Sequence, residues 1–145
     1  MERGASNCSP FLLGVFIKMV VLIEKGSPFF DFEKAKKGYF LNQDKLDDEN
    51  GFEHLFANGL FWNAYKKGYV GTLFAYQGED ERWYMGGWAE RKRHKDCVKA
   101  VMQVADFFPV IYAQTKHLNA VICLKAAGFR WLSRDNGLLI RRKEI

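Results

Sequence analysis

The fold is decided by the stretch RWYMGGWAERKRHKDCVKAVMQVADFF, residues 82–108. Its first part, residues 82–88, is aromatic and has the residue types of a strand. Apolar residues then recur at helical spacing over residues 95–108, at Val98, Val101, Met102 and Ala105. Pro109 ends this helix, and residues 110–114 have the composition of another short strand. The stretch therefore predicts a β-α-β unit with a basic segment between its first strand and its helix.

Residues outside this unit predict two hairpins and one more helix. Residues 60–65 and 69–76 are expected to be strands joined by a turn at Lys66-Lys67-Gly68, and residues 82–88 extend them into a meander. Residues 130–133 and 138–141 form a closing hairpin around Asp135-Asn136-Gly137, because Asn-Gly favours a tight turn. A helix over residues 117–127 is expected to stop at Gly128–Phe129. Glycine suits the left-handed position after a helix, and the apolar residue beyond it can fold back.

The N-terminal third predicts two helices. Ser9-Pro10 has the residue types of a helix start, and the helix is expected over residues 11–24, ending at Gly26. The apolar run 11–23 is too short to cross a bilayer and contains Lys18, so we expect it to pack against the sheet of a soluble protein. After the Ser27-Pro28 break, Asp31 is expected to cap a helix over residues 32–41. Residues 42–50 are loop-like, and the apolar segment 52–57 stays unassigned.

These elements predict one α/β domain spanning residues 1–145, with a mixed sheet of about six strands flanked by about four helices. No strand is expected before the first helix, because few residues precede Ser9. The composition, 48% hydrophobic and 16% aromatic, favours a globular core over disorder.

The three cysteines are widely separated, with no C-x-x-C pair, which favours a reducing compartment over a disulfide framework or a thiolate zinc site. No metal is expected.

The net charge of +5 is concentrated in two clusters, residues 91–95 and residues 141–143. Such clusters are either solvated faces or anion sites. The first cluster lies where a strand leads into a helix, and helix N-termini bind anions through free N–H groups and the dipole.

The order of elements resembles the GNAT superfamily of N-acetyltransferases, as found in bacterial and phage-borne members. The resemblance runs from the first apolar helix through the Ser27-Pro28 break, the meander and the Gly128–Phe129 ending to the Gly-Leu-Leu-Ile-Arg-Arg-Lys tail, residues 137–143. It implies a site in which acetyl-CoA lies between splayed strands, with pantetheine between Gly86, Gly87 and Trp88 on one side and residues 111–113 on the other. The pyrophosphate would be bound by Arg91, Lys92, Arg93, His94 and Lys95. Gly86-Gly87 has a second explanation, which is relief of crowding between aromatic side chains.

The chain departs from the family at the residues that do chemistry. The family motif R/Q-x-x-G-x-G/A is matched only by Arg91, with no glycine after it, and Asp96 would lie where an anion binds. Leu124 occupies the position of the family's general acid, a tyrosine, and either faces the cleft between the splayed strands or is a core residue. Asn119 is the residue nearest to the family's asparagine at the start of the last helix, and His117 is either a pantetheine contact or a surface residue. Glu81 and Tyr84 are the predicted catalytic residues, from a group that also contains Glu79 and Asp80.

The first functional hypothesis is transfer of an acetyl group from acetyl-CoA to an amine of a small molecule or protein, in the cytoplasm. The second is a non-catalytic GNAT-like protein, acting as a virion component or a binder of a host factor. Its aromatic residues would suit a protein partner or a homodimer. Nucleic-acid binding is the weakest hypothesis, because the charge excess is small and no recognition motif is present. Membrane association is not expected.

Overall fold

The computed structural model describes residues 19–46 and 50–144. Its elements follow the order β1 (Val21–Glu24), α2 (Phe32–Leu41), the 3-10 turn η2 (Gln43–Lys45), α3 (Phe52–Asn58), β2 (Leu60–Tyr65), β3 (Tyr69–Gln77), β4 (Trp83–Ala89), α4 (His94–Ala105), β5 (Val110–Gln114), α5 (Leu118–Ala126), β6 (Arg130–Ser133) and β7 (Leu138–Arg142). Every strand expected after residue 60 is confirmed. Within the described residues, no helix is long and apolar enough to cross a membrane.

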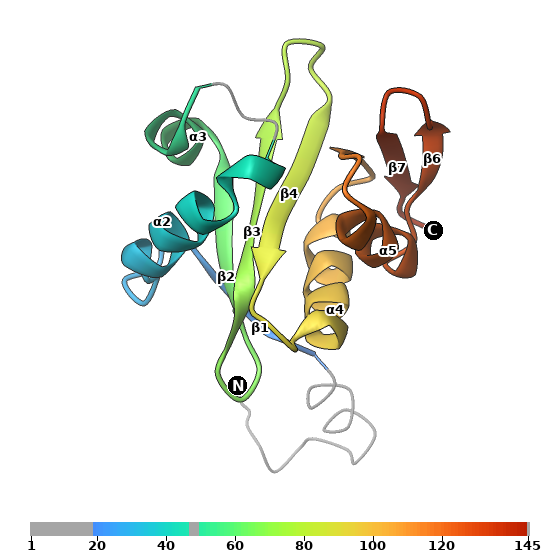
Figure 1. Cartoon of the computed structure of the whole chain (residues 1–145). Coiled ribbons are helices and arrows are strands. Elements are labelled where there is room, and N and C mark those ends of the chain that lie inside the picture. Colours follow the sequence, from blue (N-terminus) through green and yellow to red (C-terminus); the bar gives the residue numbers. More distant parts are fainter. Residues whose placement is uncertain (1–18, 47–49, 145) are drawn as a thin grey trace.

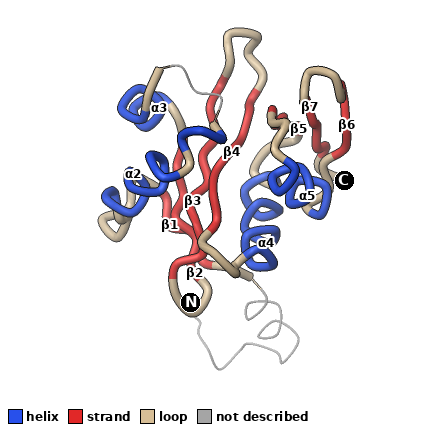
Figure 2. The backbone as a smooth tube through the Cα atoms, in the orientation of Figure 1, coloured by secondary structure: helices blue, strands red, loops and turns tan. Residues whose placement is uncertain are grey.

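The described strands form one mixed sheet in the order β1-β2-β3-β4-β5-β7-β6. Neighbouring strands are antiparallel except β4 and β5, which are parallel and joined through α4. The predicted α/β fold class is confirmed, with seven strands in place of about six. Figures 1 and 2 show α2 and α3 on one side of the strands and α4 and α5 on the other.

The additional strand corrects the prediction of a helix over residues 11–24. Residues 11–18 lie outside the described residues, but Val21–Glu24 is a strand, paired with β2 from Val21 opposite Tyr65 to Glu24 opposite Trp62. A short apolar run does not distinguish a strand from a buried helix by periodicity. Here β-branched Val21 and Ile23 satisfy their backbone groups at the edge of β2. The structure therefore contains a strand, β1, before the first described helix, where the sequence predicted none.

Helices α2 and α3 cover one face of the sheet with an aromatic cluster. Asp31 caps α2 as predicted, its carboxylate accepting a hydrogen bond of 3.0 Å from the Lys34 N–H. The unassigned segment 52–57 is α3, so the two helices before the meander are α2 and α3. The buried residues of this cluster are Ala35, Tyr39, Phe52, Leu55, Phe61, Phe74 and Trp88.

Helices α4 and α5 cover the opposite face around Val101, Val104, Ile111 and Leu139. The end of α5 follows the prediction closely. Gly128 has φ 100°, the Phe129 N–H donates to the Leu124 carbonyl at 2.9 Å, and Phe129 is buried. This is the Schellman arrangement expected from Gly128–Phe129. It turns the chain from α5 directly into β6.

Candidate active site

The two parallel strands diverge at the centre of the sheet. Among the described residues, the β4–β5 ladder is limited to Tyr84 opposite Tyr112, whereas all of β4, from Trp83 to Ala89, pairs with β3. Beyond Tyr84, the edge of β4 that faces β5 is not paired with that strand. Backbone groups on such an edge can bind an extended ligand that lies like an added strand. The predicted proximity of these two strands is confirmed.

The two glycines of β4 are explained by their neighbours on β3. A Cβ on Gly86 would lie 2.7 Å from Cζ of Phe74, so this glycine relieves crowding against an aromatic ring. Gly87 has φ 157°, and a Cβ there would lie 2.3 Å from the Thr72 carbonyl oxygen. The Trp88 side chain is buried in the α2/α3 cluster. Gly87 and Trp88 therefore offer only their backbone to a ligand between β4 and β5.

A hollow of about 340 Å³ lies at the start of α4, lined by Lys92, Arg93, His94, Lys95 and Asp96. The first helical hydrogen bond runs from the Cys97 N–H to the Arg93 carbonyl, and no side chain caps the helix. The N–H groups of the first turn therefore point out of the helix without an intrahelical acceptor. Such N–H groups, together with the helix dipole, favour a bound anion. The structure thus gathers four of the five predicted basic residues, Lys92, Arg93, His94 and Lys95, around this helix end, whereas Arg91 does not line the hollow.

The negative charge of Asp96 is compensated by two neighbouring cations, Arg93 and Lys66. Its carboxylate accepts hydrogen bonds from the Arg93 guanidinium at 3.0 and 3.2 Å, and the Lys66 Nζ lies 3.8 Å away. The Arg93 guanidinium also donates to the Lys66 carbonyl. Arg93 therefore joins α4 to the β2–β3 turn, and the exposed cations left for a ligand are Arg91, Lys92 and Lys95.

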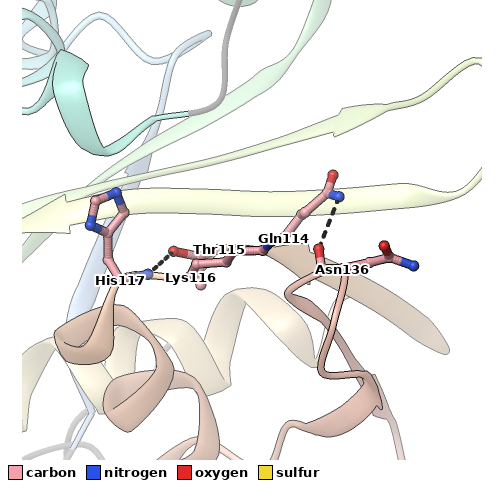
Figure 3. Close-up of a pocket in the computed structure, with 5 residues that line it drawn as sticks. All are labelled: Gln114, Thr115, Lys116, His117 and Asn136. Atoms are coloured by element: carbon pink, nitrogen blue, oxygen red, sulfur yellow. Dashed lines mark hydrogen bonds between the residues drawn. The ribbon is translucent and has the colours of Figure 1, made fainter.

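A second hollow of about 340 Å³ lies at the carboxyl end of β5, lined by Gln114, Thr115, Lys116, His117 and Asn136. The Thr115 N–H donates to the Gly137 carbonyl at 2.8 Å, and the Thr115 hydroxyl accepts from the His117 N–H at 3.2 Å. Figure 3 shows the His117 ring and the Gln114 amide projecting to the same side of this segment. Asn119, the second residue of α5, is exposed and does not line the hollow.

The two predicted catalytic residues lie in different surroundings. Tyr84 is at the point of divergence, and its hydroxyl donates a 2.7 Å hydrogen bond to the Asp80 carboxylate. Partial burial and this carboxylate raise the pKa of Tyr84, and the Tyr84 hydrogen bond lowers the pKa of Asp80. Glu81 is exposed in the β3–β4 turn with φ 67°. Tyr84 is therefore a neutral hydrogen-bond donor beside the strand opening, and Glu81 is a turn residue.

The structure also brings together groups that the sequence separates. Cys97 of α4 and Cys123 of α5 are both free thiols that interact side by side. Their hydrogen bond, together with burial, raises the pKa of Cys97, and the same hydrogen bond lowers the pKa of Cys123.

The sheet also aligns three tyrosines: Tyr84 lies in register between Tyr76 of β3 and Tyr112 of β5. Strand register alone creates this row, and spacing along the chain does not reveal it.

Leu124 is a core residue with 8% of its surface exposed. Replacing it with tyrosine is therefore expected to destabilise the fold, because overpacking typically costs about 1–3 kcal/mol. The substitution is not expected to supply a general acid. Thermal unfolding should show a clear loss for Leu124→Tyr and little change for Ile122→Tyr, a control at a 57% exposed position of the same helix. A stable Leu124→Tyr protein with a higher rate of acetyl transfer would contradict this expectation.

The geometry defines an α/β protein in which a parallel strand pair opens beside a basic helix N-terminus. No protein-family model and no curated protein sequence matches the chain. Solved structures do match. An acetyltransferase of the GNAT family from Staphylococcus aureus Mu50 is 18% identical, has a TM-score of 0.56, and the match covers 86% of this chain and 99% of that one.

Two further matches were solved with acetyl-CoA. The Campylobacter jejuni N-acetyltransferase PseH, in complex with acetyl coenzyme A, is 10% identical with a TM-score of 0.59, covering 87% of this chain and 100% of that one. A GNAT family acetyltransferase from Elizabethkingia anophelis, with acetyl-CoA bound, is 13% identical with a TM-score of 0.57, covering 86% and 98%. The chain therefore has the fold of the GNAT N-acetyltransferases.

Proposed function

We propose that this protein transfers an acetyl group from acetyl-CoA to a primary amine of a small molecule or protein. The observation that carries the proposal is the divergence of β4 and β5 after Tyr84 and Tyr112, next to the uncapped start of α4. An extended pantetheine arm fits the free strand edge, and a pyrophosphate fits the N–H groups and cations of the helix end. Two proteins of the same fold bind acetyl-CoA, which supports the assignment.

The residues present suit direct transfer. The amine nitrogen forms a bond to the acetyl carbon, the carbon–sulfur bond breaks, and the amine proton is released as the thiol of CoA forms. A backbone N–H on the open edge of β4 would polarise the thioester carbonyl. Tyr84 lies at the point of divergence and is our choice for the acid: its hydroxyl proton, donated to Asp80 in this structure, would pass to the leaving sulfur once the hydroxyl turns away from the carboxylate. Cytoplasmic location stays a prediction from the sequence.

The test is calorimetry and thermal unfolding with acetyl-CoA and with CoA. A ligand at 100 times its dissociation constant should stabilise the fold by about 2.7 kcal/mol. Release of the CoA thiol in the presence of a panel of amines then measures transfer. If neither ligand binds, the enzyme proposal fails and a non-catalytic GNAT-like protein takes its place. If acetyl-CoA binds and no amine is acetylated, acetyl-CoA is a ligand and the proposed transfer is wrong.

A further inference from the structure

Three tyrosines from three adjacent strands form a continuous row on the α2/α3 face of the sheet. Tyr76 lies opposite Tyr84, and Tyr84 lies opposite Tyr112. The Tyr76 and Tyr84 ring centroids are 5.7 Å apart with the planes inclined by 16°, and those of Tyr84 and Tyr112 are 5.7 Å apart at 41°. All three side chains are half-buried. We call Tyr76, Tyr84 and Tyr112 the tyrosine row.

The tyrosine row begins at the aromatic core and continues past it. Tyr76 packs against the cluster under α2 and α3, whereas Tyr84 and Tyr112 belong to neither core cluster. Tyr84 and Tyr112 mark the point where β4 and β5 separate. Under the proposed function, this is where the extended pantetheine arm ends and the thioester lies. The row is therefore a partly exposed aromatic surface beside the reacting carbon.

Charged groups at the row are suited to a cationic ligand. The Asp80 carboxylate accepts the hydrogen bond of the Tyr84 hydroxyl at 2.7 Å, and it is itself well exposed. The Arg82 guanidinium lies 4.6 Å from the centroid of the Tyr112 ring, and its Nε lies 3.9 Å from Asp80. Arg82 therefore already occupies the face of Tyr112, and its backbone N–H donates to the other Asp80 carboxylate oxygen at 3.0 Å, so an incoming ammonium group shares this carboxylate with Arg82. Ring faces attract cations, and a carboxylate beside them anchors an ammonium group.

We propose that the acceptor is a primary amine linked by a short chain to an aromatic group. Its ring stacks on the tyrosine row, and its ammonium group is held by Asp80 until it loses a proton and attacks the thioester. This inference rests on the proposed function and names its substrate class. The reaction is balanced as RNH3⁺ plus acetyl-CoA giving RNHCOCH3, CoA thiol and one proton released to water. The flat pair Tyr76–Tyr84 favours an aromatic body over a flexible aliphatic chain, because offset ring pairs add attraction beyond buried area.

The experiment compares kcat/KM for acetyl transfer to 2-phenylethylamine, n-octylamine and spermidine. We expect 2-phenylethylamine to be preferred by about tenfold, because paired aromatic rings attract each other beyond the effect of the area they bury and the row offers more than one ring. Tyr112→Leu should raise the KM for 2-phenylethylamine by about tenfold and leave the KM for n-octylamine nearly unchanged. Tyr65→Leu, at a half-buried tyrosine of β2 outside the row, is the matched control. Asp80→Asn should raise the KM for all three amines.

Calorimetry with acetyl-CoA distinguishes a failure of the proposed function from a failure of the proposed substrate class. If the wild-type protein binds acetyl-CoA and acetylates spermidine or n-octylamine as well as or better than 2-phenylethylamine, the substrate class is wrong and the proposed function stands. An equal effect of Tyr112→Leu on aromatic and aliphatic amines also overturns the assignment. If acetyl-CoA does not bind at all, the proposed function fails and the inference fails with it. Stabilisation of the CoA-bound protein by 2-phenylethylamine, lost in Tyr112→Leu, gives a readout independent of turnover.

Discussion

The variant Gly38→Ala is expected to unfold at a lower temperature and denaturant concentration than the wild-type protein. Gly38 lies inside α2, where alanine would normally be favoured by about 1 kcal/mol. A Cβ at this position, however, would lie 2.0 Å from Nε1 and 2.6 Å from Cε2 of Trp88. Such overlap in a packed core costs about 1–3 kcal/mol, and occasionally more. The loss from crowding should therefore exceed the gain in helix propensity.

The Trp88 indole has little room to move away from the added methyl group. Its side chain is 6% exposed, and its ring lies 6.4 Å from that of Tyr39 and 6.2 Å from that of Phe74. Trp88 also lies near the end of β4, so a displaced indole would disturb the strand edge proposed to bind pantetheine. Gly38→Ala should consequently weaken acetyl-CoA binding as well as stability.

The control is Gly26→Ala, because the nearest atom to a Cβ there is the Glu24 Oε1 at an ordinary distance of 3.6 Å. Urea unfolding of both variants gives the comparison. A double-mutant cycle with Trp88→Phe should show that the smaller ring partly relieves the cost of Gly38→Ala. Equal stability of Gly38→Ala and wild type would mean that the indole is not held where the structure places it.

Replacing Arg91 and Lys95 together with alanine is expected to weaken acetyl-CoA binding at least about tenfold. Hydrogen bonds to charged groups contribute about 1.5–3 kcal/mol each, and about 1.4 kcal/mol corresponds to a factor of ten in affinity. Both side chains are exposed at the uncapped start of α4. Neither is engaged as Arg93 is, so the substitutions should leave stability almost unchanged. Calorimetry with acetyl-CoA measures the affinity.

The matched control is Arg142→Ala with Lys143→Ala, which removes the same charge from two exposed residues of the C-terminal tail. An equal loss of affinity in both double variants would show that only net charge matters. Unchanged affinity for Arg91→Ala with Lys95→Ala would identify the cluster as a solvated face. Arg93→Ala is expected to behave differently and to reduce stability, because it leaves Asp96 with only the weaker contact to Lys66.

Much of the fold was predictable from the sequence because its signals are local. Asp31 before an amphipathic segment, Asn136–Gly137 between two apolar runs and Gly128–Phe129 after a helix each specify backbone geometry within a few residues. The alternation of strand-like and helical patterns after residue 60 was sufficient for the mixed sheet. It was also sufficient to place the basic segment 91–95 between a strand and a helix, and hence at a helix N-terminus.

Other features depend on partners distant in the chain, and only the tertiary structure decides them. Val21–Glu24 is a strand because β2 offers an edge, although its apolar run also suits a helix. Leu124 is a core residue because α5 presents that side to the sheet, which the sequence could not indicate because apolar residues lie on several sides of this helix. Arg93 pairs with Asp96 and Lys66 rather than with a ligand because the β2–β3 turn lies beside α4. The alignment of Tyr84 with Tyr112 requires the register between two strands separated by a helix. Sequence periodicity determines which face a residue takes within its own element, whereas packing between elements determines what that residue meets.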